Sequence, residues 1–354
     1  MKNSENKSLL LNPTDTIFFR DGRPFNMGED TYAQGIFPPP PSVLYGALRT
    51  AYMAANLSGE KLSVLITKTE QLTITGIFLR ASDGHTYLPM PKDLYVKKDA
   101  NAGFFPEKKV STTSSLPTSL QMLLHNVNGK PDEQARLVRL EEFQKYLAQG
   151  KTAEKITSIP LKDFTEKEPK IGIRRNNQTH ANDEGLLYRM EMVRPAKVRD
   201  GELYQLSFLV DYQGLDLPAE TWLRMGGDRK AVQLTKFEEP TQIGCPELKS
   251  SEFKIYLATP AVFESGWKPR KLLDDNNLEL LAAATGKPMP LGGWDVKEKK
   301  PKCMLRAVPA GSVYYVKAES KEKAQATAEK IHNHTISEYD LAQQGFGLAF
   351  IGNI

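Results

Sequence analysis

Residues 312–333 read SVYYVKAESKEKAQATAEKIHN, a run of β-branched and aromatic residues followed directly by a run of strong helix formers. The first part has the composition of a strand, and the part rich in alanine, lysine and glutamate has that of a helix. A further strand pattern, GLAFIGNI, follows at residues 347–354. This succession of strand, helix and strand predicts the second half of a β-α-β-β-α-β unit.

The residues before 312 supply the other half of that unit. We predict a strand for FKIYLATPAVF at 253–263, a helix at about 275–285 that ends at Gly286, and a strand for CMLRAVPAG at 303–311. The C-terminal half of the chain is therefore expected to be a ferredoxin-like domain.

The N-terminal half follows the same order less regularly. Four prolines at 38–41 precede a predicted helix that begins with Ser42 as its N-cap and ends before Gly59. Gly46 lies inside this helix, where a glycine indicates close backbone packing. A strand at 71–80 and an amphipathic helix at 133–149 follow, separated by an irregular insertion at about 97–131.

These patterns predict an α+β protein of two tandem ferredoxin-like (RRM-like) domains with insertions. The 354 residues of the chain agree with about two domains. We place the first domain at 1–213, with a long insertion at about 90–190 that includes a basic hairpin. The second domain spans 214–354 and carries a terminal glycine-rich loop.

Composition excludes several classes of protein. Hydrophobic residues make up 40% and charged residues 25% of the chain, and no apolar run approaches the length of a membrane span. The N-terminus shows no export signal. Cys245 and Cys303 are the two cysteines, and neither has a partner at zinc-ligand spacing. We therefore expect a cytoplasmic protein with reduced thiols, no metal and no cofactor.

Signatures of catalysis are nearly missing from the sequence. The motifs HExxH, GxSxG and GxxxxGK[ST] do not occur. His180, in the loop IGIRRNNQTHAND at 171–183, is the one histidine whose setting suits acid or base chemistry on RNA. Spacing suggests no second titratable group for it, so we predict that the protein is not an enzyme.

Positive charge is concentrated in one segment. The net charge is +4, and residues 170–199 contain seven basic residues against three acidic ones. The segment IGIRRNNQTHANDEGLLYRMEMVR at 171–194 predicts a long hairpin, which could follow a nucleic-acid backbone. Its candidate RNA contacts are Arg174, Arg175, His180 and Arg189.

Three further segments combine glycine or tryptophan with basic residues, and each has a plain structural alternative. WLRMGGDRKAVQL at 222–234 could grip a phosphate backbone or form a β-hairpin turn. SGWKPRKLL at 265–273 could stack a base on Trp267 or be a solvated charge run beside a buried tryptophan. QQGFGLAFIG at 343–352 could cradle a phosphate or be a turn into the last strand. The candidate residues are Gly226, Gly227, Arg229, Lys230, Lys268, Arg270, Lys271, Gly345 and Gly347.

Several segments, taken in order, resemble the repeat-associated mysterious protein (RAMP) superfamily. They are TDTIFFRDGRPF, PPPPSVLYGALRT, the hairpin at 171–194, RMGGDRKAVQL, LGGWDVKEKKPKCMLRAVPAGSVYYV and GFGLAFIG. The first and fifth of these narrow the resemblance to the family of subunit three of the Cmr complex, the type III-B CRISPR effector. Residues 90–165 match no recognised pattern, and their role is open.

This resemblance implies two ferredoxin-like domains and no catalytic role. The protein would hold the 5′ handle of the CRISPR RNA, pair with the large cyclase-type subunit and lie beside the adjacent backbone RAMP subunit. The family's glycine-rich loop falls on Gly345, Gly347 and Gly352, and its first helix start on 42–49. Arg20, Arg23 and Arg49 complete the candidate RNA contacts.

Three alternatives stay open. The chain could be the equivalent handle-binding subunit of a type III-A complex, or a metal-independent CRISPR-RNA processing endoribonuclease of the same fold that uses His180. It could also be an adaptor that contacts only protein, in which case it would show no salt-dependent affinity for RNA.

Overall fold

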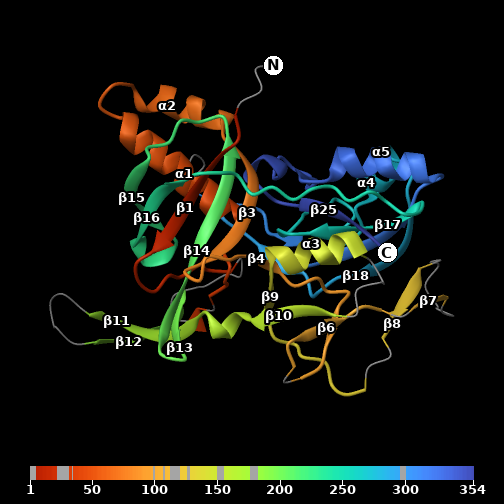
Figure 1. Ribbon diagram of the computed structural model, residues 1–354. Helices are drawn as coiled ribbons and strands as arrows, with labels where there is room; N and C mark the ends of the chain where they lie inside the picture. The colour runs from red at the N-terminus through yellow and green to blue at the C-terminus, as the bar shows by residue number, and fades with distance from the viewer. Residues whose placement is uncertain are drawn as a thin grey trace.

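Two β-sheets form the body of the protein. The computed structural model describes residues 5–21, 32–33, 35–98, 100–106, 108–111, 120–125, 128–149, 155–175, 182–295 and 300–354. Within these residues an 11-stranded sheet is built mainly from the N-terminal half and a five-stranded sheet from the C-terminal half. Figure 1 shows the two sheets side by side.

The larger sheet has the strand order β15-β16-β1-β14-β3-β4-β9-β10-β6-β5, with β13 also paired to β14. Alternate residues of its strands, such as Leu9 and Leu11, are buried, as expected for a sheet with one face on the core. The strands are β1 (Lys7–Pro13), β3 (Thr73–Ala81), β4 (Thr86–Pro89), β5 (Tyr95–Val96), β6 (Ala102–Phe104), β9 (Arg136–Arg139), β10 (Ile156–Pro160), β13 (Ala196–Arg199), β14 (Glu202–Gln213), β15 (Glu220–Met225) and β16 (Lys230–Phe237).

In the four neighbouring strands β16-β1-β14-β3, each strand runs antiparallel to the next. Their order is the one that a β-α-β-β-α-β chain produces. No α-helix connects β14 to β16 in the described residues; the connection contains β15, which forms a hairpin with β16. Because β1 pairs with β16, the first sheet extends to Phe237. A domain boundary at 213/214 would divide this sheet between two domains.

Helix α1 (Pro41–Asn56) covers the core of the larger sheet. It begins with Pro41 after the N-cap Pro40, so the predicted cap at Ser42 is wrong by two positions. A proline suits the first helical turn, where its missing N–H has no intrahelical acceptor. Gly46 is exposed, and a Cβ atom there would have nothing within 4 Å, so the predicted close packing is also wrong. Helix α2 (Leu62–Lys68) and the 3-10 turn η1 (Thr69–Gln71) follow.

The helix predicted at 133–149 is correct only from residue 140. Residues Arg136–Arg139 form β9 because they pair with β4 and β10 inside the larger sheet. Helix α3 (Leu140–Gln149) then buries Phe143, Tyr146 and Leu147. The insertion predicted to be irregular contains β6 and an antiparallel pair, β7 (Lys108–Ser111) and β8 (Gln121–Leu124).

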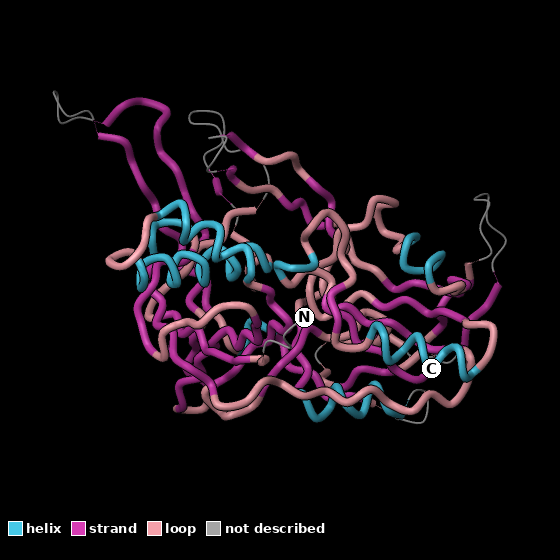
Figure 2. Tube along the Cα trace, turned by 90° about the horizontal axis from the view of Figure 1, so that it is seen from above, coloured by secondary structure: helices cyan, strands magenta, loops and turns pink. Residues whose placement is uncertain are grey.

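The predicted basic hairpin is confirmed. After the 3-10 turn η3 (Leu161–Asp163), strands β11 (Glu166–Arg175) and β12 (Asn182–Arg194) pair antiparallel along most of their length. β12 also pairs in parallel with β2 (Tyr32–Ala33). Figure 2 shows the hairpin projecting from the body of the molecule.

The smaller sheet has the order β18-β23-β17-β25-β24. Its first four strands are again in the order of a β-α-β-β-α-β unit, although the tandem ferredoxin-like arrangement of the whole chain stays a prediction. The elements are β17 (Glu252–Leu257), α4 (Arg270–Asp275), β18 (Glu279–Ala284), β23 (Val313–Lys317), α5 (Lys321–Ile331), β24 (His334–Thr335), η5 (Ala342–Gln344) and β25 (Leu348–Asn353); two short pairs are β19 (Met289–Leu291) with β22 (Leu305–Ala307) and β20 (Trp294–Asp295) with β21 (Lys300–Pro301).

The strand and helix predicted at 312–333 are confirmed as β23 and α5, and Ser320 caps the helix by accepting a hydrogen bond from the Lys323 N–H. The helix predicted at 275–285 is wrong. In this region only residues 270–275, which form α4, are helical, and residues 279–284 form β18, which pairs with β23. Pairing at the sheet edge here outweighs the helix propensity of leucine and alanine.

A buried polar cluster joins the two halves. The Asp93 carboxylate, in the loop after β4, accepts hydrogen bonds from the Tyr146 hydroxyl of α3 at 2.8 Å and from the Tyr315 hydroxyl of β23 at 2.7 Å. The Tyr256 hydroxyl of β17 donates to the Pro89 carbonyl at 2.6 Å. The ammonium of Lys254 lies 3.5 Å from the centroid of the Tyr146 ring. These contacts attach β4 and α3 to the smaller sheet.

Candidate nucleic-acid interface

The structure brings three of the predicted RNA-binding segments together at the root of the β11–β12 hairpin. Ile17 of the N-terminal segment forms a bridge with Val193 of β12, and Arg20 forms one with Gly35. The Gly227 N–H donates to the Phe18 carbonyl at 2.8 Å. We name this region the hairpin base; it comprises Asp15, Phe18, Arg20, Gly35, Lys170, Arg194, Gly226, Gly227, Asp228 and Lys230.

Ion pairs compensate most of the positive charge of the hairpin base. Lys170 pairs with Asp228 at 2.5 Å, and Lys230 pairs with Asp15 at 3.3 Å. Arg194 pairs with Asp15 at 3.2 Å and also with Glu168. A hydrogen bond from the Thr16 N–H and the two cations hold the pKa of Asp15 below its usual value. These pairs lie at the surface, so each contributes little to stability and can be exchanged for contacts with phosphate.

The paired glycines of the hairpin base have a packing role. A Cβ atom at Gly226 would lie 2.5 Å from the Phe18 carbonyl oxygen, and one at Gly227 would lie 2.8 Å from Cδ1 of Phe18. Gly226 also has a φ of 75°, which favours glycine. The segment connects β15 to β16 through the turn η4 (Gly227–Arg229), which agrees with the hairpin-turn alternative. Sterics at Phe18 therefore account for both glycines.

Arg189 is the exposed arginine of the hairpin whose side chain the structure describes. It lies in β12 opposite Ile171 of β11, which is 63% exposed. Arg174 and Arg175 belong to β11, but only their backbone is described, and for Arg229 the side chain is likewise outside the description. Arg23 and His180 lie outside the described residues. The hairpin thus presents an arginine and an apolar side chain together.

Two other predicted contacts lie apart from the hairpin base. Arg49 of α1 donates from Nε to the Thr69 hydroxyl at 2.9 Å and lies over the Tyr45 ring at 5.6 Å, so its guanidinium serves packing between α1 and η1. The cations of the tryptophan segment, Lys268, Arg270 and Lys271, are exposed at α4. Figure 1 places α4 and the hairpin at opposite ends of the molecule.

The terminal glycine loop is buried and internally hydrogen-bonded. The Gly345 N–H donates to Ala342, the Phe346 N–H to Leu341 and the Gly347 N–H to Pro260. Gly345 has a φ of 91°, and a Cβ atom there would lie 2.8 Å from Cγ2 of Ile74 in β3. No N–H of these three residues is left for a phosphate. The structural alternative, a tight turn into β25 packed on β3, describes this loop.

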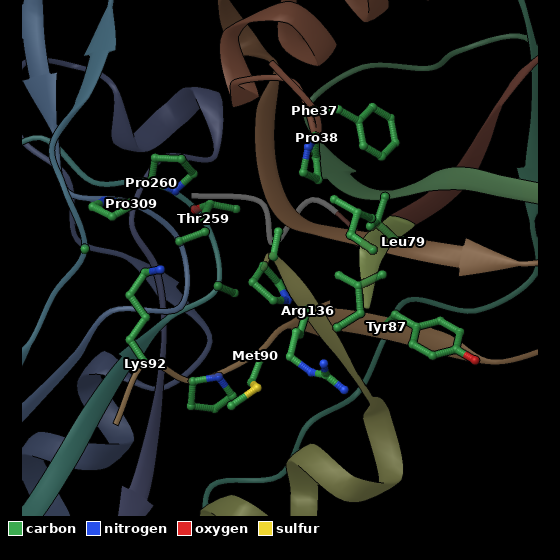
Figure 3. Close-up of a pocket in the computed structure, with 18 of the residues that line it drawn as sticks. Phe37, Pro38, Leu79, Tyr87, Met90, Lys92, Arg136, Thr259, Pro260 and Pro309 are labelled. Carbon is green, nitrogen blue, oxygen red and sulfur yellow. The ribbon is translucent and has the colours of Figure 1, made fainter. Parts of the chain in front are cut away.

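A cavity between the two halves was not predicted from the sequence. It has a volume of about 810 Å³ and is lined by residues from positions 35 to 310, including the prolines Pro38, Pro39, Pro41, Pro89, Pro91, Pro131, Pro260 and Pro309. Figure 3 shows proline and aliphatic side chains around it, with Lys92 and Arg136 among them. Its lining residues are dispersed along the chain, and only the run of four prolines at 38–41 is a local signal.

The two cations of this cavity differ in their partners. Arg136 is buried and donates to Asp132 at 2.5 Å, to the Ser158 hydroxyl at 2.9 Å and to Asn101 at 2.7 Å. Lys92 is exposed to the cavity and forms no ion pair with another described residue. Its backbone N–H donates to the Gly311 carbonyl at 2.8 Å, which fixes its position relative to the C-terminal half.

Features of metal sites and membrane spans are missing from the described parts of the chain. These parts contain no group of three or more His, Cys, Asp and Glu side chains that could hold a metal ion. Both cysteines are free thiols. None of the helices described is long and apolar enough to cross a membrane.

Comparison with known proteins identifies relatives. A family model described as CRISPR-associated protein (Cas_Cmr3) matches residues 9–354, and no curated protein matches the chain. A chain of a type III-B Cmr-beta structure bound to cognate target RNA is similar with a TM-score of 0.52 and 17% identity, over 87% of this chain and 86% of that chain. A chain of Cmr-beta bound to target RNA and AMPPnP has a TM-score of 0.50 and 16% identity, over 92% and 90%. At this identity the two structures support the fold.

Proposed function

Because the chain belongs to the CRISPR-associated Cas_Cmr3 family, we propose that it is a non-catalytic, RNA-binding subunit of a type III-B CRISPR effector complex. It holds the 5′ handle of the CRISPR RNA, pairs with the large cyclase-type subunit and contacts the adjacent backbone RAMP subunit. The family match over nearly the whole chain carries this proposal.

The hairpin base supports the RNA-binding part of the proposal. A projecting antiparallel hairpin with an exposed arginine, rooted among exchangeable surface ion pairs, can follow a phosphate backbone without reading sequence. Arg20 is exposed at the same root. RNA therefore binds along β11 and β12 and across the hairpin base.

The test is a titration of the protein, alone and with its large partner, with RNA that carries a repeat-derived 5′ end. We expect salt-dependent binding and no cleavage, with or without a divalent metal. Cleavage that is lost in His180→Ala would instead support the processing endoribonuclease. Salt-independent or missing RNA affinity would support the adaptor that contacts only protein.

Co-purification distinguishes the two kinds of complex. Expression with a type III-B operon is expected to recover the protein with the large subunit, a backbone subunit and CRISPR RNA. Recovery only with type III-A subunits would assign it to the equivalent position there.

A further inference from the structure

The cavity between the halves is shaped before any ligand arrives. Its eight prolines have fixed φ angles, and its walls come from both sheets. Hydrogen bonds across the junction, from the Tyr256 hydroxyl to the Pro89 carbonyl and from the Lys92 N–H to the Gly311 carbonyl, hold opposite walls in place. A cavity of about 810 Å³ is within the range that binds small organic ligands, and a rigid one loses little entropy on binding.

Its walls suit a flat, partly apolar group. The half-buried side chains of Phe37 and Tyr95 line it together with the prolines and Met90. Planar faces of this kind pack against a nucleobase regardless of its identity. The cavity therefore has the surface chemistry for a single unstacked base.

One end of the cavity suits an anion. Lys92 has no ion-pair partner among the described residues, whereas the carboxylate of Asp132 pairs with Arg136 at 2.5 Å. Glu133, the other lining carboxylate, is exposed and is the next residue along the chain. A phosphate group would accordingly bind at the Lys92 side.

Two features position the Lys92 ammonium. Its neighbour Asp93 is 1% exposed and is fixed by Tyr146 and Tyr315. Gly286 leaves room for the end of the lysine and for Pro309, because a Cβ atom there would lie 3.0 Å from Cγ of Pro309, 3.1 Å from Cε and 3.2 Å from Nζ of Lys92. Asp93 and Gly286 thus act as positioning residues for Lys92.

We propose that this cavity binds one nucleotide, with the base between the proline and aromatic walls and the phosphate at Lys92. The nucleotide can be free or can belong to an RNA chain. The second source rests on the proposed function, and the first does not.

Free nucleotides test the cavity alone. Adenosine 5′-monophosphate and uridine 5′-monophosphate are titrated into the full chain at low salt, followed by calorimetry. Lys92→Met is expected to weaken binding about tenfold or more, because it removes one charge-assisted hydrogen bond. Lys98→Met, at an exposed lysine of the same segment that does not line the cavity, should leave the affinity unchanged.

A second variant changes no charge. Gly286→Ala is expected to displace the end of Lys92 and to lower nucleotide affinity severalfold, whereas Gly293→Ala, whose Cβ would lie 3.5 Å from the flexible Lys302 side chain, should not. Melting temperatures establish that both variants fold. If the nucleotides do not bind, or if they bind and both cavity variants match the wild type, the proposal is overturned.

RNA with a repeat-derived 5′ end distinguishes the source. A series of these RNAs is prepared, each with one base removed at a different position. If the cavity binds a base of the RNA, removal of that base should weaken binding to the wild type but have no effect on binding to Lys92→Met. RNA binding that is insensitive to every abasic position and to Lys92→Met contradicts an RNA source but leaves the proposed function intact. If RNA does not bind at all, the proposed function fails while the mononucleotide result still decides the cavity.

Discussion

Lys254 lies in the core beneath α3, with 1% of its surface exposed. Its ammonium lies 3.5 Å from the centroid of Tyr146 and 5.0 Å from that of Phe105, and both rings face it. Desolvation lowers the pKa of Lys254 to about 8, and the charge of Asp93 opposes this shift. A buried lysine held by aromatic faces keeps its charge near neutral pH at a cost in stability.

This environment predicts a pH dependence of stability. Between about pH 8 and the unfolded value of about 10.5, the unfolded chain binds more protons at Lys254 than the folded chain, so the free energy of unfolding rises with pH. From pH 8 to 9.5 the contribution is about 1.5 kcal/mol. Urea denaturation of the wild type and Lys254→Met across this range should show their difference changing by that amount.

Comparison with the variant cancels the other groups that titrate in this range, such as the Cys245 thiol, whose pKa burial raises. Above pH 10 the buried tyrosines act in the opposite direction, because burial raises the pKa of Tyr146 and Tyr256. A difference between wild type and variant that is constant from pH 8 to 9.5 would show that Lys254 titrates normally.

Few of the individual residues that form the cavity and the buried polar cluster could be predicted from the sequence. Lys92, Asp93 and Lys254 carry no local pattern, since their environments are made by residues far apart in the chain. Gly345 and Gly347 stand out in the sequence, but a glycine that approaches a phosphate and a glycine that packs under Ile74 look the same there. Only the surrounding hydrogen bonds separate the two.

The turn before β25 is an element whose glycine contributes to stability. Gly345→Ala is expected to destabilise the protein by about 1–3 kcal/mol, because the added methyl group meets Ile74 at a positive φ, while the folded fraction keeps its RNA affinity. Denaturant unfolding and an RNA titration on the same sample measure both.

Gly84→Ala is the matched control. Its φ of 81° imposes a similar backbone strain, but nothing lies within 4 Å of the added Cβ. The difference between the two variants isolates the contact with β3. If Gly345→Ala were as stable as the wild type but no longer bound RNA, the result would support the alternative in which this loop binds a phosphate.

The β11–β12 hairpin predicts a salt effect. Arg174→Ala, Arg175→Ala and Arg189→Ala combined should lower the slope of log affinity against log salt by about one per phosphate contact removed, up to about three. RNA of different sequences should lose affinity alike, since the contacts are to the backbone. Fluorescence anisotropy at several salt concentrations gives the slope.

The cations at α4 provide the comparison. A variant with Lys268→Ala, Arg270→Ala and Lys271→Ala removes three exposed charges at the opposite end of the molecule. Its slope should change less than that of the hairpin variant. If the α4 variant instead lowered the slope more than the hairpin variant, the RNA site would lie at α4.

Elements were predicted well where the residue pattern or composition of the segment itself is strong, as in α1, α5 and the hairpin, even though the start of α1 was placed two residues late. They were predicted poorly where pairing partners decide. Residues 136–139 and 279–284 have helix-compatible composition, yet β9 and β18 form because neighbouring strands supply their hydrogen bonds. A single sequence holds no signal of those neighbours.

Each sheet has its own hydrophobic cluster, and a third cluster that includes Phe78 and Phe350 joins the two sheets, which predicts cooperative unfolding of the whole molecule. Phe350 of β25 is fully buried and lies 6.5 Å from Phe78 of β3 and 5.7 Å from Phe143 of α3, measured between ring centroids. Phe350→Ala should cost about 3–5 kcal/mol and lower hydrogen-exchange protection in β3 and β17 together.

Leu203→Ala, at a side chain that is 59% exposed, should stay within about 0.5 kcal/mol of the wild type. If Phe350→Ala loosened β17 and left the protection of β3 unchanged, the two halves would be independent units. The predicted division at 213/214 follows a change in composition, whereas pairing of β1 with β16 keeps residues up to Phe237 in the first sheet.

The ends of the two sheets also bear on whether the isolated protein aggregates. The larger sheet ends at one side in β5, a strand of two residues, and at the other in β15, where exposed Glu220 and Arg224 flank Trp222. The smaller sheet ends at one side in the two-residue β24. Short or charged edge strands are poor templates for pairing with another chain. These three edges are therefore not expected to seed cross-β pairing between copies of the protein.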